Sequence, residues 1–317
     1  MNMKESAQHI YHVPVMCEEV CRLLVTRPDG VYVDCTYGGG GHSMAILKRL
    51  SPKGKLICIE KDLDSPVHLI DDPRVFPIRG DFRHVANYLE FLGLGKATGI
   101  LADLGLSWHQ LDTVERGFSF RREGALDMRI HKHQELSAQV FLAQTSEEEL
   151  EYVLRQYGEL PHSRQVARRI IQQRNQRPLF TSTDLKDALE GLTLRGSHEK
   201  LLACVFQAIR IHVNGELEAL RKLLQSVPEI LEPEGRVAII SYHSLEDRLV
   251  KNFFRTGDFE GKVRSDAYGR VLRPLEPLMP ELIRPTEEEK AQNSRARSAR
   301  LRVAIKPVSA YDESPGN

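Results

Sequence analysis

The chain has 317 residues, with 44 Lys and Arg against 44 Asp and Glu, so its formal net charge is zero. Hydrophobic residues make up 41% and charged residues 28%, which excludes a disordered chain, a collagen and a disulfide scaffold. A protein that is basic over its whole surface is also excluded. Separate basic patches are not excluded, because balanced totals can hide them.

The composition also bears on the compartment. The longest apolar runs fall far short of the ~18 residues that a bilayer-spanning helix needs, and the first residues lack the apolar region of a signal peptide. The five cysteines include no C-x-x-C pair, which argues against a zinc ribbon or a thioredoxin-like site. We therefore expect a cytoplasmic protein with reduced thiols and no membrane partner.

Strand and helix signals alternate along the first third of the chain. Apolar runs predict strands over 31–34, 55–60, 75–78 and 98–103, and helical spacing of apolar residues predicts a helix over 42–50. Short loops separate these elements. This alternation predicts a parallel sheet with right-handed connections.

Helical signals dominate from about residue 111 to residue 210. Ser146 and Glu149 predict a capping box for a helix that Gly158 ends, and further helices are expected over 164–174, 183–189 and 201–224, with an interruption near Gly215. Strand signals return at 235–241 and 299–305, with a helix over 244–254 between them. The charged, Pro-containing stretch 256–298 is expected to be loop-like, and 307–317 a tail.

These signals predict an α/β fold whose sheet is interrupted by an all-helical domain after the fourth strand. Residues 1–110 and 211–317 form the two parts of the sheet domain, and residues 111–210 form the insertion.

The first strand leads into a run of four glycines, which is typical of a nucleotide-like ligand site. A P-loop is excluded because no Lys follows the glycines, and a dinucleotide fingerprint is only partly matched because Ser43 stands at its third glycine position. Asp34, Gly38 and Gly40 fit a loop for S-adenosylmethionine. Glu60 ends the second strand, where an acid can accept both ribose hydroxyls, but NAD enzymes use the same device.

Asp103 ends the fourth strand, at the same edge of the predicted sheet. An exocyclic amine on a nucleic-acid base is weakly nucleophilic, because its lone pair is delocalised into the ring. A carboxylate that accepts its N–H would localise that pair and orient it. The alternative for Asp103 is a helix N-cap after the strand.

Five segments, in this order, resemble the bacterial MraW/RsmH methyltransferase family: His12–Val15, Asp34–Ser43, Glu115–Phe120 with Leu126–Arg129, Tyr242–Arg248 and Asn293–Ser298. The resemblance spans nearly the whole chain. It implies a class I S-adenosylmethionine-dependent methyltransferase (Rossmann-like) sheet with a helical insertion. It also implies methyl transfer to the N4 amine of a cytosine in the decoding centre of 16S rRNA.

The resemblance implies S-adenosyl-L-methionine as cofactor, no metal, and 16S rRNA in the small ribosomal subunit as partner, and it leaves a homodimer open. With the glycine loop, it gives the cofactor-binding residues Gly38, Gly40, Gly41, His42, Glu60, Phe82, Asp103 and Gln110. Glu60 stands where the family more often has Asp. Two departures are Trp108, which would stack on the target base or pack under the insertion, and Cys204, where the family has Arg.

For catalysis we expect direct in-line transfer, with Asp103 orienting the amine. Ser107 and His243 are further candidates for contact with the base, and a helix-cap role for His243 and Ser244 is equally open. The target cytosine must be unstacked to enter the site.

Three arginine-rich segments are candidate RNA contacts. They contain Arg116, Arg121, Arg122 and Arg129, then Arg168 and Arg169, then Arg295 and Arg297. Phe118 and Phe120 lie within the first segment and are expected either to stack on bases or to join the core of the insertion. For any one segment the alternative is a solvated helix face.

Two other classes of protein remain open from the sequence. One is an NAD-dependent oxidoreductase with a helical substrate domain, and the other is a non-catalytic RNA-binding or ribosome-assembly factor that keeps the fold.

Overall fold

The computed structural model describes residues 14–65, 70–192 and 197–308. His12 and Val13 of the His12–Val15 segment, and residues 309–317 of the expected tail, lie outside this part of the chain. Two compact units are present. Unit 1 contains residues up to Gly105 and from Ala219 onward, and unit 2 contains Leu106–Glu218. Unit 2 is wider than the 111–210 insertion, because α4 (Trp108–Asp112) and the first residues of α10 (Glu216–Ile230) belong to it.

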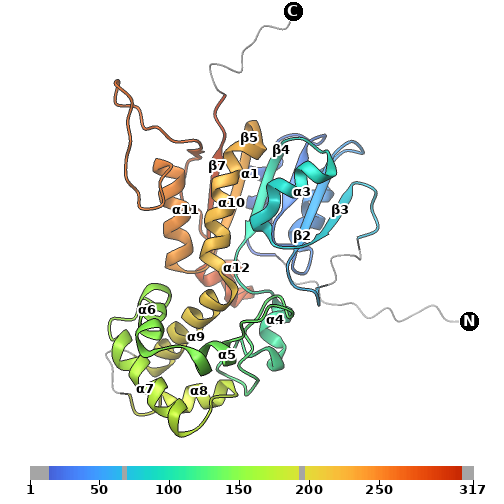
Figure 1. The fold of residues 1–317 in the computed structure, drawn as a ribbon. Helices are drawn as coiled ribbons and strands as arrows, with labels where there is room; N and C mark the ends of the chain where they lie inside the picture. The colour runs from blue at the N-terminus through green and yellow to red at the C-terminus, as the bar shows by residue number, and fades with distance from the viewer. Residues whose placement is uncertain (1–13, 66–69, 193–196, 309–317) are drawn as a thin grey trace, which may run out of the picture. The chain divides into compact units, whose positions relative to one another are not determined.

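Unit 1 is built on a seven-stranded sheet in the order β3-β2-β1-β4-β5-β7-β6 (Figure 1). The first five of these strands are parallel, and β7 runs antiparallel to both of its neighbours. The bounds are β1 Val31–Asp34, β2 Lys55–Glu60, β3 Val75–Arg79, β4 Ala97–Asp103, β5 Leu231–Ser241, β6 Glu276–Pro277 and β7 Arg300–Ile305. The predicted α/β class and its parallel strands are confirmed.

Both faces of this sheet are buried, which is why its central strands are almost continuously apolar. Side chains of β1, β2 and β4 that point to one face, such as Tyr32, Leu56 and Leu101, pack with α1 (Cys17–Leu24) and α2 (Gly41–Leu47). In Figure 1 the other side is covered by α3 (Val85–Leu92), α10 (Glu216–Ile230) and α11 (Ser244–Thr256).

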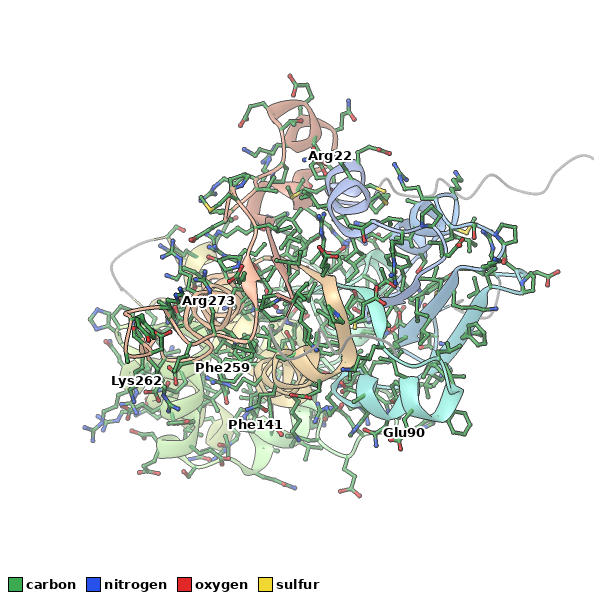
Figure 2. The ribbon with its side chains drawn as sticks, turned by 90° about the horizontal axis from the view of Figure 1, so that it is seen from above. Arg22, Glu90, Phe141, Phe259, Lys262 and Arg273 are labelled. Carbon is green, nitrogen blue, oxygen red and sulfur yellow. The ribbon has the colours of Figure 1, made fainter. Side chains whose placement is uncertain are left out.

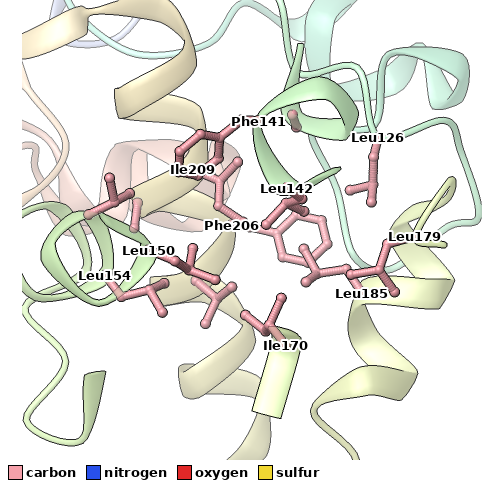
Figure 3. Close-up of a cluster of buried hydrophobic side chains, with 14 of the residues drawn as sticks. Leu126, Phe141, Leu142, Leu150, Leu154, Ile170, Leu179, Leu185, Phe206 and Ile209 are labelled. Carbon is pink, nitrogen blue, oxygen red and sulfur yellow. The ribbon is translucent and has the colours of Figure 1, made fainter. Parts of the chain in front are cut away.

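Unit 2 contains helices and no strand among its described residues. Its helices are α4 Trp108–Asp112, α5 Ala138–Gln144, α6 Glu147–Gly158, α7 Ser163–Gln176, α8 Ser182–Ala188 and α9 His198–Asn214. The helix α9 is buried along most of its length, and its Phe206 and Ile209 lie among leucines from α5 and α6 (Figure 3). Unit 2 therefore has a hydrophobic core of its own.

Several sequence expectations need correction. At the start of α6, the Ser146 hydroxyl accepts the Glu149 N–H at 3.1 Å, but the Glu149 carboxylate accepts the Thr145 hydroxyl, so only half of the predicted capping box forms. The left-handed residue after α6 is Glu159, with φ 48°, not Gly158. The stretch 256–298 is not all loop, because it contains β6 and α12 (Glu287–Gln292).

The interruption expected near Gly215 is confirmed: this residue has φ 61° and separates α9 from α10. The described part of the chain contains no helix that is long and apolar enough to cross a membrane.

Candidate functional site

The loop between β1 and α2 is held by side chains from its own two ends. Asp34, buried at the end of β1, accepts the Ser43 hydroxyl at 2.6 Å and the Thr36 N–H at 3.0 Å. Gly38 and Gly40 have φ of 53° and 78°, which L-residues rarely adopt. A Cβ on Gly40 would lie 2.6 Å from the Tyr37 hydroxyl, so this position is closed to larger residues. Gly41 opens α2.

Glu60 faces the same loop from the end of β2. One carboxylate oxygen accepts the Gly38 N–H at 2.8 Å and the other accepts the Asp62 N–H at 2.7 Å. Each carboxylate oxygen keeps a second lone pair, so the two oxygens together can still accept two ribose hydroxyls. The side chain is only 7% exposed, and burial raises the pKa of its carboxyl despite the two N–H groups. The glycine loop and Glu60 thus form one hydrogen-bonded element.

Phe82 follows β3 and reaches the same edge of the sheet. Glu60 is in register with Arg79 of β3, and the Glu60 carbonyl accepts the Gly80 N–H at 2.8 Å. Phe82 then opens a short 3-10 turn capped by Asp81, and it is half-buried. The structure therefore brings the Phe82 segment to Glu60, as the expected site requires.

Asp103 lies at the end of β4 with one of its two carboxylate oxygens engaged. Its Oδ1 accepts the Tyr242 hydroxyl at 2.8 Å, and its backbone N–H donates to the Thr36 hydroxyl at 2.7 Å. Its Oδ2 lies 3.6 Å from His42 Nδ1, which is too far for a hydrogen bond. Asp103 is not a helix N-cap, because Ser107 caps the next helix. The Asp103 side chain is 22% exposed, and within the described residues no hydrogen bond engages Oδ2, which leaves this oxygen as an acceptor at this edge of the sheet.

His42 is held by the chain that precedes α1. Its Nε2 lies 3.0 Å from the Val15 carbonyl, and since a carbonyl only accepts, Nε2 carries a hydrogen. When the ring is neutral, Nδ1 therefore presents a lone pair towards Asp103. The ring is 6% exposed, so His42 is a buried neighbour of the carboxylate.

The surroundings of Asp103 shift its pKa. Burial raises the pKa of this carboxyl from 3.8 to about 6, while His42 and the Tyr242 hydroxyl lower it less strongly. Burial also raises the pKa of Tyr242, which keeps its hydroxyl protonated and donating. A carboxyl that titrates near neutrality can take up and release a proton during turnover.

Two of the expected catalytic residues are helix caps. His243 caps α11, with its Nδ1 accepting the Glu246 N–H at 3.4 Å, so the cap alternative for His243 is the one observed. Its Nε2 lies 3.1 Å from the Glu246 carboxylate, but not in hydrogen-bond geometry. Ser107 and Gln110 form a reciprocal capping box at the start of α4, in unit 2. Their expected contacts with base and cofactor stay predictions, and the Trp108 side chain lies outside what the structure describes.

The candidate RNA-binding arginines fall into two groups. Four are engaged within unit 2. Arg116 donates to the carbonyls of Arg129 and Ile130, and Arg129 pairs with Asp127 through two hydrogen bonds. Arg168 pairs with Glu147 at 3.3 Å, and Arg169 donates to the Ala188 carbonyl at 3.1 Å. These four guanidinium groups therefore have partners within unit 2.

The second group contains arginines that are more accessible to a ligand. Arg121, Arg122 and Arg297 are exposed, and within the described residues no hydrogen bond or ion pair engages their guanidinium groups. Arg295 is half-buried. Phe118 is buried in the core of unit 2 and Phe120 packs edge-on against Phe206, which favours the core interpretation over base stacking.

The sequence did not reveal two partners of Asp103. Tyr242 lies 139 positions away and Thr36 lies 67 away, and neither pairing has a local signature. The only available signal was placement: Thr36 follows β1, Tyr242 follows β5, and both strands neighbour β4. Parallel strands end at one edge of a sheet, which brings such residues together.

The family follows from comparison with known proteins. Residues 9–307 match the model of the MraW methylase family. The chain belongs to the MraW methylase family. It is 46% identical over 296 residues to the ribosomal RNA small subunit methyltransferase H of Christiangramia forsetii, covering 93% of this chain and 98% of that protein. It is 44% identical over 303 residues to the protein of that name from Parabacteroides distasonis, covering 95% and 99%.

A solved structure of a putative rRNA methylase from Clostridium thermocellum aligns with a TM-score of 0.39 at 11% identity, covering 96% of this chain and all of that one. That likeness is too weak to carry an assignment. Membership of the MraW family makes the protein a methyltransferase, and its cofactor is S-adenosylmethionine. The donor set fits this cofactor: a buried carboxylate with two lone pairs to spare stands beside a glycine loop, with an aromatic residue following the next strand.

Proposed function

We propose that this MraW-family enzyme transfers a methyl group from S-adenosylmethionine to the N4 amine of a cytosine in the decoding centre of 16S rRNA. The relatives' name supports the substrate, since both are small-subunit rRNA methyltransferases. The observation that carries the chemistry is Asp103, whose Oδ2 is free at the edge of the sheet that carries the glycine loop. A free carboxylate oxygen there suits an amine acceptor.

When bound, S-adenosylmethionine supplies a methyl group already activated by a sulfonium. The N4 lone pair forms the new C–N bond as the C–S bond breaks, and N4 then loses one proton. Asp103 Oδ2 accepts an N4–H bond, which turns the amine towards the methyl group and localises its lone pair. Oδ2 also takes the released proton, which its raised pKa of about 6 permits.

Three groups position Asp103 for this task. The Tyr242 hydroxyl holds Oδ1, the Thr36 hydroxyl accepts the Asp103 N–H, and His42 borders Oδ2. With Oδ1 engaged, Oδ2 is the oxygen left for the substrate. Ser107 and His243 are retained as further candidates for contact with the base.

The cofactor is proposed to lie against Gly38, Gly40 and Gly41, with Glu60 on its ribose and Phe82 beside its adenine. His42, Asp103 and Gln110 complete the proposed set. The spare lone pairs of Glu60 support the ribose contact.

Unit 2 is proposed to recognise RNA, with the exposed Arg121 and Arg122 as candidate contacts, and Arg297 of unit 1 is proposed separately as a further candidate. We propose that the substrate is the small ribosomal subunit rather than naked RNA, because zero net charge makes binding depend on local patches. The place of action is then the cytoplasm. A homodimer stays a prediction, which sedimentation of the pure protein tests.

The deciding experiment uses small subunits from cells that lack the modification. The protein and methyl-labelled S-adenosylmethionine are added, and the rRNA is digested to nucleosides for mass spectrometry. We expect label in N4-methylated cytidine at one site. Label in another nucleoside would refute the proposed target, and binding without transfer would favour the assembly-factor alternative. The NAD-dependent alternative is already wrong, since the family is a methylase family.

A further inference from the structure

A long hairpin projects from unit 1 between α11 and β6. This hairpin arm, residues 257–275, is the orange loop beside α11 in Figure 1. Its two sides are paired: Ser265 bridges Val271, and the Leu272 N–H donates to the Arg264 carbonyl at 2.7 Å. Residues 262–265 and 267–272 are nevertheless exposed. The arm is therefore a hydrogen-bonded hairpin whose side chains are mostly exposed.

The tip of the arm is a turn that is held by hydrogen bonds. Asp266 accepts the N–H groups of Tyr268 and Arg270 at 2.8 and 2.9 Å, and its own N–H donates to the Arg270 carbonyl. Gly269 supplies the φ of 79° that closes the turn. This turn presents Tyr268, whose side chain is 87% exposed. A preordered tip loses little conformational entropy when it binds a partner.

The base of the arm is anchored to unit 1. Phe259 stacks on Phe253 of α11 with ring centroids 5.0 Å apart, and the Arg221 guanidinium carbon lies over the Phe259 ring, 5.0 Å from its centroid. The Asn252 amide donates to the Phe259 carbonyl at 2.9 Å. Figure 2 labels Phe259 and Lys262 on the outgoing side of the arm and Arg273 on its returning side, where the Arg273 guanidinium donates to the Arg255 carbonyl at 3.3 Å. The anchored base and exposed tip indicate a surface for binding rather than a packing element.

The chemistry of the arm selects the partner. The hairpin arm contains four cations, Lys262, Arg264, Arg270 and Arg273, and three acids, of which Asp258 and Glu260 precede the cations and Asp266 accepts the N–H groups of the turn. Lys262 pairs with Glu260. In the described parts of the chain no hydrogen bond or ion pair engages the guanidinium groups of Arg264 and Arg270, although the charge of Arg264 helps to lower the pKa of Asp258. Unpaired arginines on both sides of an exposed tyrosine match phosphates and an unstacked base.

We propose that the hairpin arm is an RNA-binding element, in which Tyr268 stacks on an unpaired base while Arg264 and Arg270 contact phosphates. This inference rests on the proposed rRNA substrate and adds a docking point outside the catalytic residues. The arm raises affinity for the RNA and leaves the chemical step unchanged. A protein partner is the competing occupant, which exposed Val263 and Leu272 would serve.

The test compares Arg264→Glu/Arg270→Glu and Tyr268→Ala with matched controls. Arg22→Glu/Lys53→Glu makes the same charge change at exposed positions elsewhere in unit 1, and Phe91→Ala removes an aromatic side chain that is 84% exposed. Binding to deficient small subunits and to single-stranded decoding-centre RNA is measured over a range of salt, without methyl transfer. Single-turnover rates and S-adenosylmethionine affinity are measured separately.

We expect the double arginine variant to bind at least tenfold more weakly and to lower the log–log salt slope by about 1.4, or ~0.7 per phosphate contact. Tyr268→Ala should weaken binding about tenfold. Both should keep the single-turnover rate at saturation and the cofactor affinity, and the controls should match wild type. Those two readouts also show that each variant is folded.

Unchanged affinity and slope in the arginine variant would overturn the proposal. So would a loss of subunit binding that follows Val263→Ser/Leu272→Ser but not the arginine reversal, since that result identifies a protein partner. If the wild-type protein binds RNA through the arm but methylates no rRNA, the proposed function fails while the arm stands.

Discussion

Asp103 must be ionised to accept an amine proton, yet burial raises its pKa to about 6. The rate of methyl transfer should therefore fall about tenfold per pH unit below pH 6, in single-turnover assays at saturating substrate between pH 5 and 8.5. Tyr242→Phe removes the hydroxyl that lowers this pKa, so its profile should shift to higher pH. A profile that stays flat down to pH 5 would remove Asp103 from the reaction.

The same residue sets a conflict between stability and activity. Because the folded-state pKa of Asp103 lies above its ordinary value of 3.8, ionisation opposes folding. This cost is absent below about pH 4, grows between pH 4 and 6, and is complete above pH 6. Asp103→Asn should thus raise the free energy of unfolding at pH 8 by on the order of 1–3 kcal/mol, while transfer falls at least a hundredfold.

Denaturant unfolding at pH 8 and pH 4 checks this prediction, because the variant's advantage should disappear at the lower pH. Asn keeps a carbonyl for the Tyr242 hydroxyl and an amide for His42, so no new unsatisfied group arises. A variant less stable than wild type at pH 8 would contradict the argument.

Glu60 is expected to bind the ribose through its spare lone pairs. Glu60→Ala should weaken S-adenosylmethionine binding at least tenfold, as measured by calorimetry, because two hydrogen bonds to a charged acceptor are lost. Glu90→Ala, an exposed acid on α3, is the matched control. An unaltered affinity in Glu60→Ala would place the ribose elsewhere.

At this scale the sequence predicted which residues stand at the edge of the sheet, but not what each one touches. Asp34, Glu60 and Asp103 were recognisable because each ends an apolar strand. The Ser43 contact of Asp34 and the Tyr242 contact of Asp103 depend on side-chain directions that no spacing encodes. The arginines show the same limit, since Arg116 and Arg121 look alike in sequence and only the first is used inside the fold.

Among the elements, α9 holds unit 2 together. Its Phe206 is 4% exposed and meets Phe120 edge-on at 5.5 Å. Phe206→Ala should lower the free energy of unfolding by about 3–5 kcal/mol, from lost burial and the cavity left behind. Thermal unfolding monitored by circular dichroism checks this, with Tyr152→Ala on exposed α6 surface as the control. Equal losses in both variants would mean that α9 is not the core helix.

Elements with strong local signals were predictable, and those without were not. Apolar runs that end in acids gave β1, β2 and β4, and Gly215 marked the end of α9. The strand β6 has two residues and includes a proline, so it exists only because β7 pairs with it. The helix α12 is acidic with no buried residue, and its Glu289 accepts the Met16 N–H, 273 positions away.

Across the whole molecule, the net charge of zero averages over unequal surfaces. Acidic side chains form ion pairs with arginines such as Arg129 and Arg168. By contrast, Arg121 and Arg122 form no ion pair within the described residues. Arg121→Glu/Arg122→Glu should lower the log–log salt slope of RNA binding by about 1.4. Filter binding measures the slope, and Arg22→Glu/Lys53→Glu serves again as control. A slope unchanged in both would move the RNA contact of unit 2 to other residues.

The strand order has a consequence for how the protein is made. Among the strands of the described residues β7 comes last in the chain, yet it pairs with β5 and β6 and is not at the edge of the sheet. Until residue 305 has left the ribosome, the apolar strand β5 remains an open edge that another nascent chain can pair with. Unit 2, by contrast, is contiguous in sequence and can fold while synthesis continues.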